Sequence, residues 1–385
     1  MRRHLGWSAA LCALTLVAAG CNTGDSGEPE GEILIGVTIE RSGPSALLGT
    51  AEANALNLVV DDINREGVLG KKIKLLIRDN KSDPLESARV VKDLVEKDKV
   101  AGIIGAGATA TTLPFLEYVE QKKVPAISMG ASETIVSPIA KRKFTFKTTP
   151  NGTEIVKVLF ADFASNDIKK VAMLAVDNQY GDNGVQALTV GAQRSGISLT
   201  ATERYAETGK DYSTEVGRLV ESEPDAILVS GIMPGAGIAA KNLQESGFKG
   251  RVYFDGGAGA DLFISGARKA SEGMFMVHAS ILAANQLTAT TPSALAQKEF
   301  FIKYTQRYGT YSGYASYSAD AINLMAEGIR KAKSTDGQKI RDALEGLSYD
   351  GLTGSYQFGP NNHGGASGDG LTMLTVRNGG WVLAQ

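Results

Sequence analysis

A glycine-rich run with the spacing of a nucleotide-binding loop is the first feature that suggests chemistry. Gly105–Ala110 has the form G-x-G-x-x-A, and it lies between a predicted strand at Val100–Ile104 and a predicted helix at Thr112–Lys122. Glycine lets a backbone approach a ligand closely, and a helix N-terminus offers unpaired N–H groups. A dinucleotide site also needs an acidic residue after the next strand, where Ser128 and Met129 stand instead. The run therefore favours an anion-binding loop over an oxidoreductase, and no cofactor is expected.

Residue types for hydrolytic or metal chemistry are scarce. Beyond the first twenty residues, the only histidines are His278 and His363, and no Gly-x-Ser-x-Gly elbow precedes a helix. The only cysteines, Cys12 and Cys21, form no cluster with histidine that would bind a metal. The segment 177–183 contains two Asp and two Asn residues, but no twelve-residue calcium loop fits it, which favours a solvated loop. An enzyme is therefore not expected.

Alternating β-rich runs and amphipathic segments must position the glycine-rich loop. Asp83 before Pro84 is typical of a helix N-cap followed by proline in the first turn. The expected elements of this first unit are strands at 33–39, 72–77, 100–104 and 124–128 and helices at 51–65, 84–97 and 112–122. This βα alternation predicts a mostly parallel sheet covered by helices on both faces.

A second α/β unit begins near Pro150. Its expected strands are 170–176, 198–205, 226–229 and 251–254, and its expected helices are 153–164, 182–194, 212–221 and 236–246. Helices at 293–308, 315–333 and 337–347 follow, and then β segments at 354–358, 371–376 and 381–383. Because these late segments do not start a third sheet, we expect the chain to cross between two lobes more than once. Ligands of such sheets bind at the carboxyl ends of the strands, and hinged closure is the expected motion.

The N-terminus has the features of an export signal. Arg2 and Arg3 precede an apolar stretch at 7–19, which is too short to span a bilayer comfortably. Its Ala-Ala-Gly-Cys ending resembles the lipobox of bacterial lipoproteins and predicts that residues 1–20 are removed and that Cys21 is lipidated. The polar residues 21–31 then form a flexible tether. We expect an exported protein that is lipid-anchored on the extracytoplasmic face of a membrane; the alternative is an N-terminal anchor helix.

Length and charge exclude some partners. The 385 residues suggest two domains. The net charge of −2 and the pI near 6.1 argue against nucleic acid as a partner, because a basic surface would be expected.

A series of short motifs, in order along the chain, resembles a known family. The motifs are 35–37 with 42–44, 55–64 with 67–70, 79–80 with 83–84 and 88–89, 102–105, 124–128, 177–181 and 224–227. Together they resemble the branched-chain amino-acid-binding family of ABC-transporter receptors, typified by the leucine/isoleucine/valine-binding protein, over about 33–383. The resemblance implies a type I periplasmic-binding-protein fold of class α/β, with two doubly wound parallel-sheet lobes joined by three hinge crossovers. It places lobe one at 32–148 with 279–348 and lobe two at 149–278 with 349–385.

The resemblance also implies where a ligand carboxylate is held. Thr109 aligns with the binding serine of the family, and Thr111 is a second candidate in the same loop. After the next strand, Ser132 matches the hydroxyl position of the family and Gly130 its backbone contact. The alternative is that these threonines only cap the helix and that Ser132 is an ordinary turn residue.

In lobe two, the resemblance points to Tyr180 as an aromatic contact and to Asp255 as the partner of a ligand ammonium group. The alternative for Tyr180 is packing against the sheet. If Asp255 does not face the cleft, the ligand is expected to be a carboxylate without an α-amino group, since a buried unpaired ammonium would be costly. Leu48, Ile232 and Met233 replace aromatic residues of the family, which predicts an aliphatic pocket wall.

The resulting hypothesis is a non-catalytic receptor that closes around an amino acid or a related small carboxylate and presents it to an ABC permease. The expected state is a monomer. The main alternative is a lipoprotein that presents its ligand to a separate sensor protein; a repressor would need a helix-turn-helix where the export signal stands.

Overall fold

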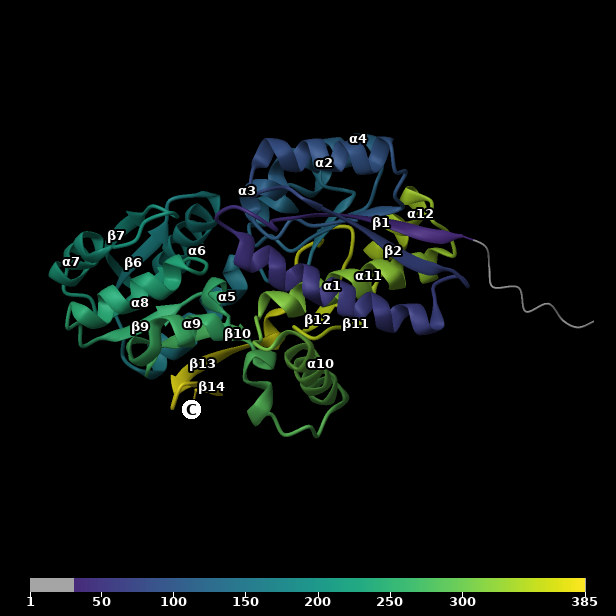
Figure 1. The fold of residues 1–385 in the computed structure, drawn as a ribbon. Helices are drawn as coiled ribbons and strands as arrows, with labels where there is room; N and C mark the ends of the chain where they lie inside the picture. Colours follow the sequence, from purple (N-terminus) through teal and green to yellow (C-terminus); the bar gives the residue numbers. More distant parts are fainter. Residues whose placement is uncertain (1–30, 385) are drawn as a thin grey trace, which may run out of the picture.

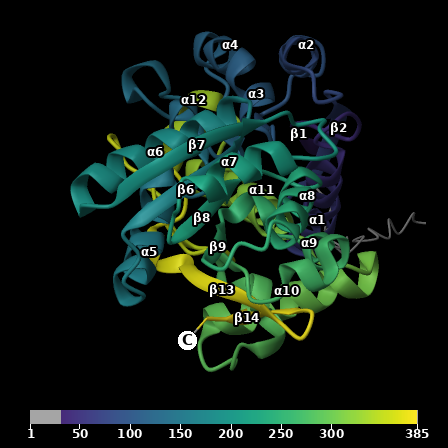
Figure 2. The same cartoon turned by 90° about the vertical axis from the view of Figure 1, so that its left-hand side faces the viewer.

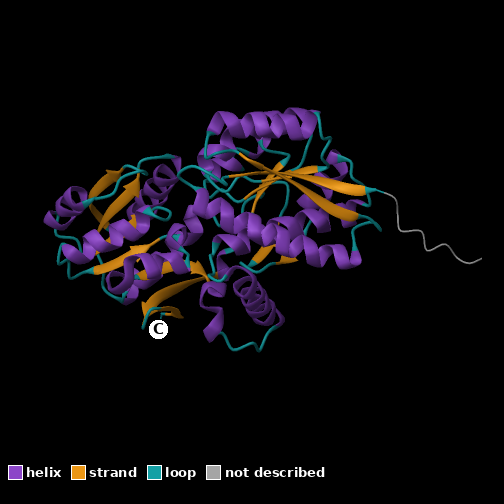
Figure 3. Cartoon of the chain, viewed as in Figure 1, coloured by secondary structure: helices purple, strands orange, loops and turns teal. Residues whose placement is uncertain are grey.

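A computed structural model describes residues 31–384, which form two α/β lobes side by side (Figure 1). Each lobe has a central sheet with helices packed on it (Figure 3). The expected signal segment, the lipidation site Cys21 and most of the tether lie outside the described residues.

The sheet of the first lobe contains five parallel strands in the order β2-β1-β3-β4-β5. Its strands are β1 (Glu32–Ile39), β2 (Lys72–Asp79), β3 (Gly102–Ile104), β4 (Ala126–Ser128) and β5 (Thr145–Lys147). Most of β1 is buried, as expected for a strand of a parallel sheet with both faces covered. The expected strands of this lobe are confirmed; β5 was not expected.

Helices cover this sheet on both faces. They are α1 (Ala46–Glu66), α2 (Pro84–Glu96), α3 (Thr109–Thr112) and α4 (Leu116–Lys122). Asp83 caps α2 as predicted, accepting the Glu86 N–H at 2.7 Å. The prediction of one continuous helix over Thr112–Lys122 was wrong. A 3-10 turn at Leu113–Phe115, which contains Pro114, separates α3 from α4, because proline cannot donate a helical hydrogen bond.

The second lobe repeats this strand order and extends it. Its seven-stranded sheet has the order β14-β13-β10-β9-β8-β6-β7. In this sheet β13 pairs antiparallel with β10, and β14 pairs antiparallel with β13. The strands are β6 (Lys170–Val176), β7 (Ser198–Tyr205), β8 (Ala226–Ser230), β9 (Arg251–Phe254), β10 (Phe275–Ala279), β13 (Leu371–Arg377) and β14 (Gly380–Leu383). The helices are α5 (Gly152–Ser165), α6 (Gln179–Ser195), α7 (Ser213–Glu221), α8 (Gly235–Glu245) and α9 (Asp261–Ala267). Figure 2 looks onto this lobe, with β13 and β14 along its lower edge.

The chain passes between the lobes three times: between β5 and α5, after β10, and between α12 (Gly337–Glu345) and β13. After the second passage, α10 (Pro292–Tyr308) and α11 (Tyr314–Ala332) return to the first lobe, where α11 packs along α1. The third passage includes a small antiparallel pair, β11 (Ser348–Asp350) and β12 (Ser355–Gln357). These passages form the three expected crossovers.

Candidate functional site

A cavity lies between the lobes, at the carboxyl ends of the parallel strands of both sheets. Its volume is about 1010 Å³ when its solvent-filled mouth is included. Loops after β1, β3, β4 and β5 line it from the first lobe, and loops after β6, β7, β8 and β9 line it from the second. In each sheet the strand order reverses direction at the first strand, between β1 and β3 and between β6 and β8. Such switch points are where open α/β sheets bind ligands, and here two of them face one cavity.

The glycine-rich loop forms part of the cavity floor. Gly107, Thr109 and Thr111 line the cavity, and Thr109 Oγ1 accepts the Ser132 N–H at 3.4 Å. A side chain at position 107 would place its Cβ 2.1 Å from Leu48 and 2.3 Å from Glu52, so only glycine fits without movement of these neighbours.

Glu40, which the sequence analysis missed, already occupies donors of this loop. Its carboxylate accepts the backbone N–H groups of Gly107 at 3.2 Å and Ala108 at 3.3 Å, the Thr111 hydroxyl and the Asn80 amide. Burial raises the pKa of Glu40, while these hydrogen bonds act in the opposite direction. Thr111 is therefore tied to an internal carboxylate. The Glu40 carboxylate already accepts hydrogen bonds from N–H groups that a dinucleotide pyrophosphate would need. This is a further argument against a dinucleotide site.

The loop after β4 places the predicted residues Gly130 and Ser132 beside the cavity rather than along its wall. The Gly130 N–H donates to Ser128 Oγ at 2.9 Å, and its carbonyl accepts from the Thr149 hydroxyl at 2.6 Å. Ser132 is buried, with its hydroxyl 2.8 Å from that of Thr134 and 3.4 Å from Asn183 Oδ1. Ala131, between them, does line the cavity. Ser132 thus joins Thr109 to the second lobe.

In the second lobe, Tyr180 lines the cavity at the start of α6. Asn178 caps this helix, accepting the N–H groups of Tyr180 at 3.0 Å and Gly181 at 3.2 Å. The Tyr180 hydroxyl is hydrogen-bonded to Asp255, which also accepts from Ser230 Oγ at 2.5 Å and from the Gly257 N–H at 3.1 Å. Burial raises the pKa of Asp255 to about 6. Asp255 lies behind Tyr180 in an adjoining smaller cavity, and Gly257 faces the main one.

The expectation of an aliphatic wall is only partly met. Leu48 and Ile232 do line the cavity, but Tyr314 and Tyr317 of α11 line it too, and Met233 lines a small adjoining pocket. These tyrosines reach the cavity because α11 packs on α1, a contact between distant parts of the sequence. The local spacing of residues in the sequence did not predict this contact.

Two further carboxylates line the cavity, and neither was predicted from the sequence. Glu52 of α1 is 2% exposed, and no donor within residues 31–384 reaches its Oε2. Burial, followed by the neighbouring Glu40, raises the pKa of Glu52 well above its usual range. Glu207 accepts from Asn178 Nδ2 at 3.3 Å and from the Ser45 hydroxyl at 3.5 Å. A signal for Glu52 existed, because its spacing to Ala55 and Val59 places it on the buried face of α1.

Polar contacts join the two lobes around the cavity. The Tyr314 hydroxyl donates to the carbonyl of Gly257, and the Thr153 hydroxyl donates to Glu133 Oε1 at 3.2 Å. The Ser45–Glu207 contact lies at the mouth. Apolar packing joins the lobes as well, because Ile232 of the second lobe lies against Leu48 and Tyr314 of the first.

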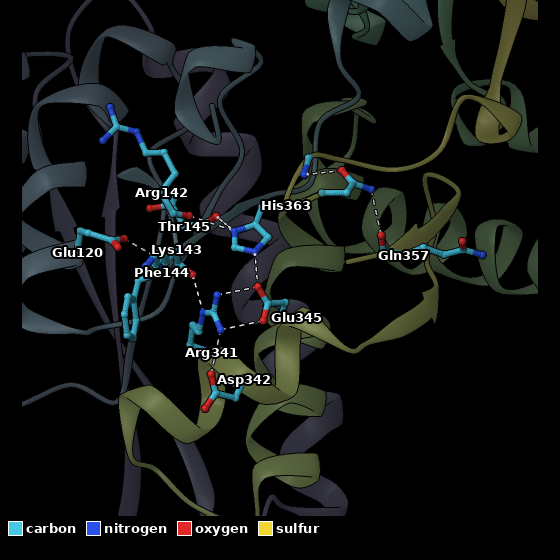
Figure 4. A network of polar contacts seen from close by, with 12 residues as sticks. Glu120, Arg142, Lys143, Phe144, Thr145, Arg341, Asp342, Glu345, Gln357 and His363 are labelled. Carbon is cyan, nitrogen blue, oxygen red and sulfur yellow. Dashed lines mark hydrogen bonds and ion pairs between the residues drawn. The ribbon is translucent and has the colours of Figure 1, made fainter. Parts of the chain in front are cut away.

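The crossovers behind the cavity are more extensively bonded. Lys147 is fully buried, and its Nζ donates to the carbonyls of Ala131 at 2.7 Å and Pro150 at 3.2 Å. Burial lowers the pKa of Lys147 to about 7. Figure 4 shows His363 of the third passage, whose Nδ1 lies 3.0 Å from the carbonyls of both Arg142 and Thr145. The same view shows the ion pair between Arg341 and Glu345 beside it.

Comparison with known proteins assigns the family. A family model described as periplasmic binding protein matches residues 32–380. The chain belongs to the periplasmic binding protein family. "Leu/Ile/Val-binding protein homolog 7" of Brucella abortus is 25% identical over 353 residues, which cover 86% of each chain. The "Leucine-, isoleucine-, valine-, threonine-, and alanine-binding protein" of Pseudomonas aeruginosa is 23% identical over 330 residues, with 82% of this chain and 83% of the relative covered.

A solved structure agrees with this assignment. An extracellular ligand-binding receptor from Rhodopseudomonas palustris HaA2 superposes with a TM-score of 0.85 at 25% identity, covering 92% of this chain and 100% of the receptor. The resemblance to the branched-chain amino-acid-binding family and the type I fold are therefore confirmed. This periplasmic binding protein is a solute-binding receptor similar to the Leu/Ile/Val-binding protein homologs. Within the described residues, no helix is both long and apolar enough to cross a membrane, and no group of acidic, His or Cys side chains is arranged to hold a metal ion.

Proposed function

We propose that this chain is the extracytoplasmic receptor of an ABC importer and that it binds an amino acid or a related small carboxylate between its lobes. The observation that carries the proposal is that both switch points face one cavity, which is lined by loops from both lobes. Its volume suits a small solute. The relatives are named for binding leucine, isoleucine and valine, and one of them also for threonine and alanine, which supports an amino acid as the ligand.

The proposed binding mode begins on the first lobe. Thr109 offers a hydroxyl at the cavity floor, and the N–H groups that open α3 lie beside it. Ser132 supports Thr109 through its N–H, and Tyr180 closes over the ligand from the second lobe. Gly130 and Asp255 act from behind the wall, by holding the Thr149 side chain and the Tyr180 hydroxyl. Ligand contacts that exist only in the closed form drive closure.

The remaining parts of the proposal concern the membrane. A lipid on Cys21 tethers the mature chain to the extracytoplasmic face of the membrane, and the closed monomer docks on a permease that takes up the ligand. The two lobes that move are residues 32–148 with 279–348 and residues 149–278 with 349–385. The order of the sheets supports this division, because β10, β13 and β14 join the second sheet.

A thermal-shift screen of the mature chain against amino acids, amides and organic acids tests the proposal. A ligand at about one hundred times its Kd adds about 2.7 kcal/mol to the free energy of unfolding, which raises the melting temperature by several degrees. We expect hits among amino acids. A screen without any hit would contradict the proposal.

A further inference from the structure

The cavity carries acidic side chains without basic ones. Glu52 and Glu207 line it, while none of the lining residues within the described chain is Lys, Arg or His. Lys147 stands behind the wall, where its Nζ is bonded to the carbonyls of Ala131 and Pro150. A ligand that carried only negative charge would therefore meet no countercharge from a side chain of the wall.

Glu52 is the carboxylate that lacks a partner. Its side chain is 2% exposed, and its Oε2 accepts no hydrogen bond from any residue of 31–384. A buried carboxylate without a donor is destabilising unless something pairs with it. Glu40, on the other side of Gly107, has its own set of donors and adds negative charge nearby. Oε2 itself is shielded from solvent, but Glu52 lines the cavity, so a ligand donor that enters the cavity can approach this carboxylate.

Aromatic rings complete the surroundings of Glu52. Tyr314 and Tyr317 line the cavity from α11, and Tyr180 lines it from the second lobe. The face of a tyrosine ring attracts a cation, and this attraction grows when water is excluded. The ionisable groups that interact with Glu52 are Glu40, Tyr304 and Tyr314, and none of them carries a positive charge.

We infer that Glu52 receives the ammonium group of the ligand, so that the cavity selects solutes bearing an amine over simple carboxylates. This inference rests on the proposed function and narrows its ligand class. It assigns the ammonium to the first lobe, whereas Asp255, the residue expected from the sequence, already has several donors behind the cavity wall. Burial, followed by the neighbouring Glu40, raises the pKa of Glu52 in the empty cavity, and an ammonium group beside it acts in the opposite direction.

Matched ligand triads test the inference by titration calorimetry on the mature chain. One triad is leucine, 4-methylpentanoate and 3-methylbutylamine; the other is phenylalanine, 3-phenylpropanoate and 2-phenylethylamine. Each acid lacks the amine and each amine lacks the carboxylate. We expect the amino acid and the amine of at least one triad to bind, with the corresponding acid at least about tenfold weaker. Tighter binding of the acids would overturn the inference and leave the proposed function standing. No binding by either triad, together with no hit in the thermal-shift screen, would overturn the inference and the proposed function together.

Three variants locate the ammonium. Glu52→Gln keeps the size of the side chain and removes its charge, so the affinity for the amine-bearing ligand should fall about 10- to 100-fold, and proton release on binding should disappear. Glu203→Gln, which removes the charge of a partly buried β7 glutamate that pairs with Arg218 of α7, is the matched control and should bind as the wild type does. Full affinity in Glu52→Gln combined with loss in Asp255→Asn would overturn the assignment. The triads measured on the wild type test the preference for amines without any variant. The inference can therefore be refuted even if a variant fails to fold.

Discussion

Asp320 and Glu52 are buried carboxylates in neighbouring parts of the molecule, and they have opposite surroundings. Asp320 of α11 accepts from the N–H groups of Leu352 at 2.8 Å and Thr353 at 3.0 Å, the Thr353 hydroxyl at 2.7 Å and the Tyr356 hydroxyl at 3.0 Å. Glu52 of α1 has an oxygen that no donor in the described chain reaches. The first ties the third crossover to the first lobe, and the second faces the cavity.

The difference separates a structural carboxylate from one kept for a ligand. Burial raises the pKa of both groups, to about 6 for Asp320 and well above the usual range for Glu52. Burial alone therefore does not distinguish them; the number of donors does. At Asp320 the third crossover uses its polar groups to fix the chain, whereas Glu52 keeps in the cavity an oxygen that a solute can satisfy.

The largest effect is expected at the crossover. Asp320→Ala leaves several buried donors without an acceptor and should lower the free energy of unfolding by more than about 3 kcal/mol, since each unpaired group contributes about 1–3 kcal/mol. Urea denaturation at neutral pH measures it. A loss below about 1 kcal/mol would mean that Asp320 is no more structural than a surface carboxylate.

The cavity floor should show its effect in binding rather than in stability. Thr109→Ala and Ser132→Ala should each weaken binding of the preferred solute by about 1–3 kcal/mol, because one removes a hydroxyl from the wall and the other loosens its support. Titration calorimetry gives the affinities, and melting temperatures serve as the control for folding. Unchanged affinity in both variants would remove the glycine-rich loop from the site.

Glu52→Gln should change the pH dependence of stability. Because the pKa of Glu52 is raised in the folded protein, the folded state keeps a proton that the unfolded state loses, so this group lowers stability as pH rises above its ordinary pKa. Glutamine does not titrate. The variant should therefore gain stability relative to the wild type, on the order of 1 kcal/mol, between pH 5 and pH 8. Parallel stability curves for the two proteins would contradict the pKa direction.

An exposed carboxylate gives the smallest effect. Asp83 accepts a single N–H, that of Glu86, at the start of α2. Asp83→Ala should lower the free energy of unfolding by about 0.5–1 kcal/mol and leave ligand affinity unchanged. Chemical denaturation and titration calorimetry check the two parts. A loss as large as that of Asp320→Ala would break the link between donor number and structural role.

The sequence was informative where the pattern was long and local. The expected strands 170–176, 198–205 and 251–254 are found with those bounds, because β-rich runs lie between clear turn or helix signals. The short strands β5 and β10 were not predicted. Their pairing depends on neighbouring strands and crossovers that no local periodicity encodes.

The candidate site could be predicted only in part for a similar reason. The family resemblance singled out Thr109 and Tyr180, which follow predicted strands, and both line the cavity. Glu52 and Tyr314 reach it through the packing of α1 on α11, which are separated by most of the chain. Asp255 was placed at the correct strand end, but its orientation depends on Ser230 and on the backbone after it.

The most direct test of the account fills the cavity. Ile232→Trp adds a large side chain to the second-lobe wall, and Leu262→Trp, at a site 38% exposed on α9, is the control. Equilibrium dialysis with the amino acid that gives the largest thermal shift measures the ligand bound per chain. We predict one ligand per chain for the wild type and the control, and none for Ile232→Trp at an unchanged melting temperature. Full binding by Ile232→Trp would show that the solute binds elsewhere.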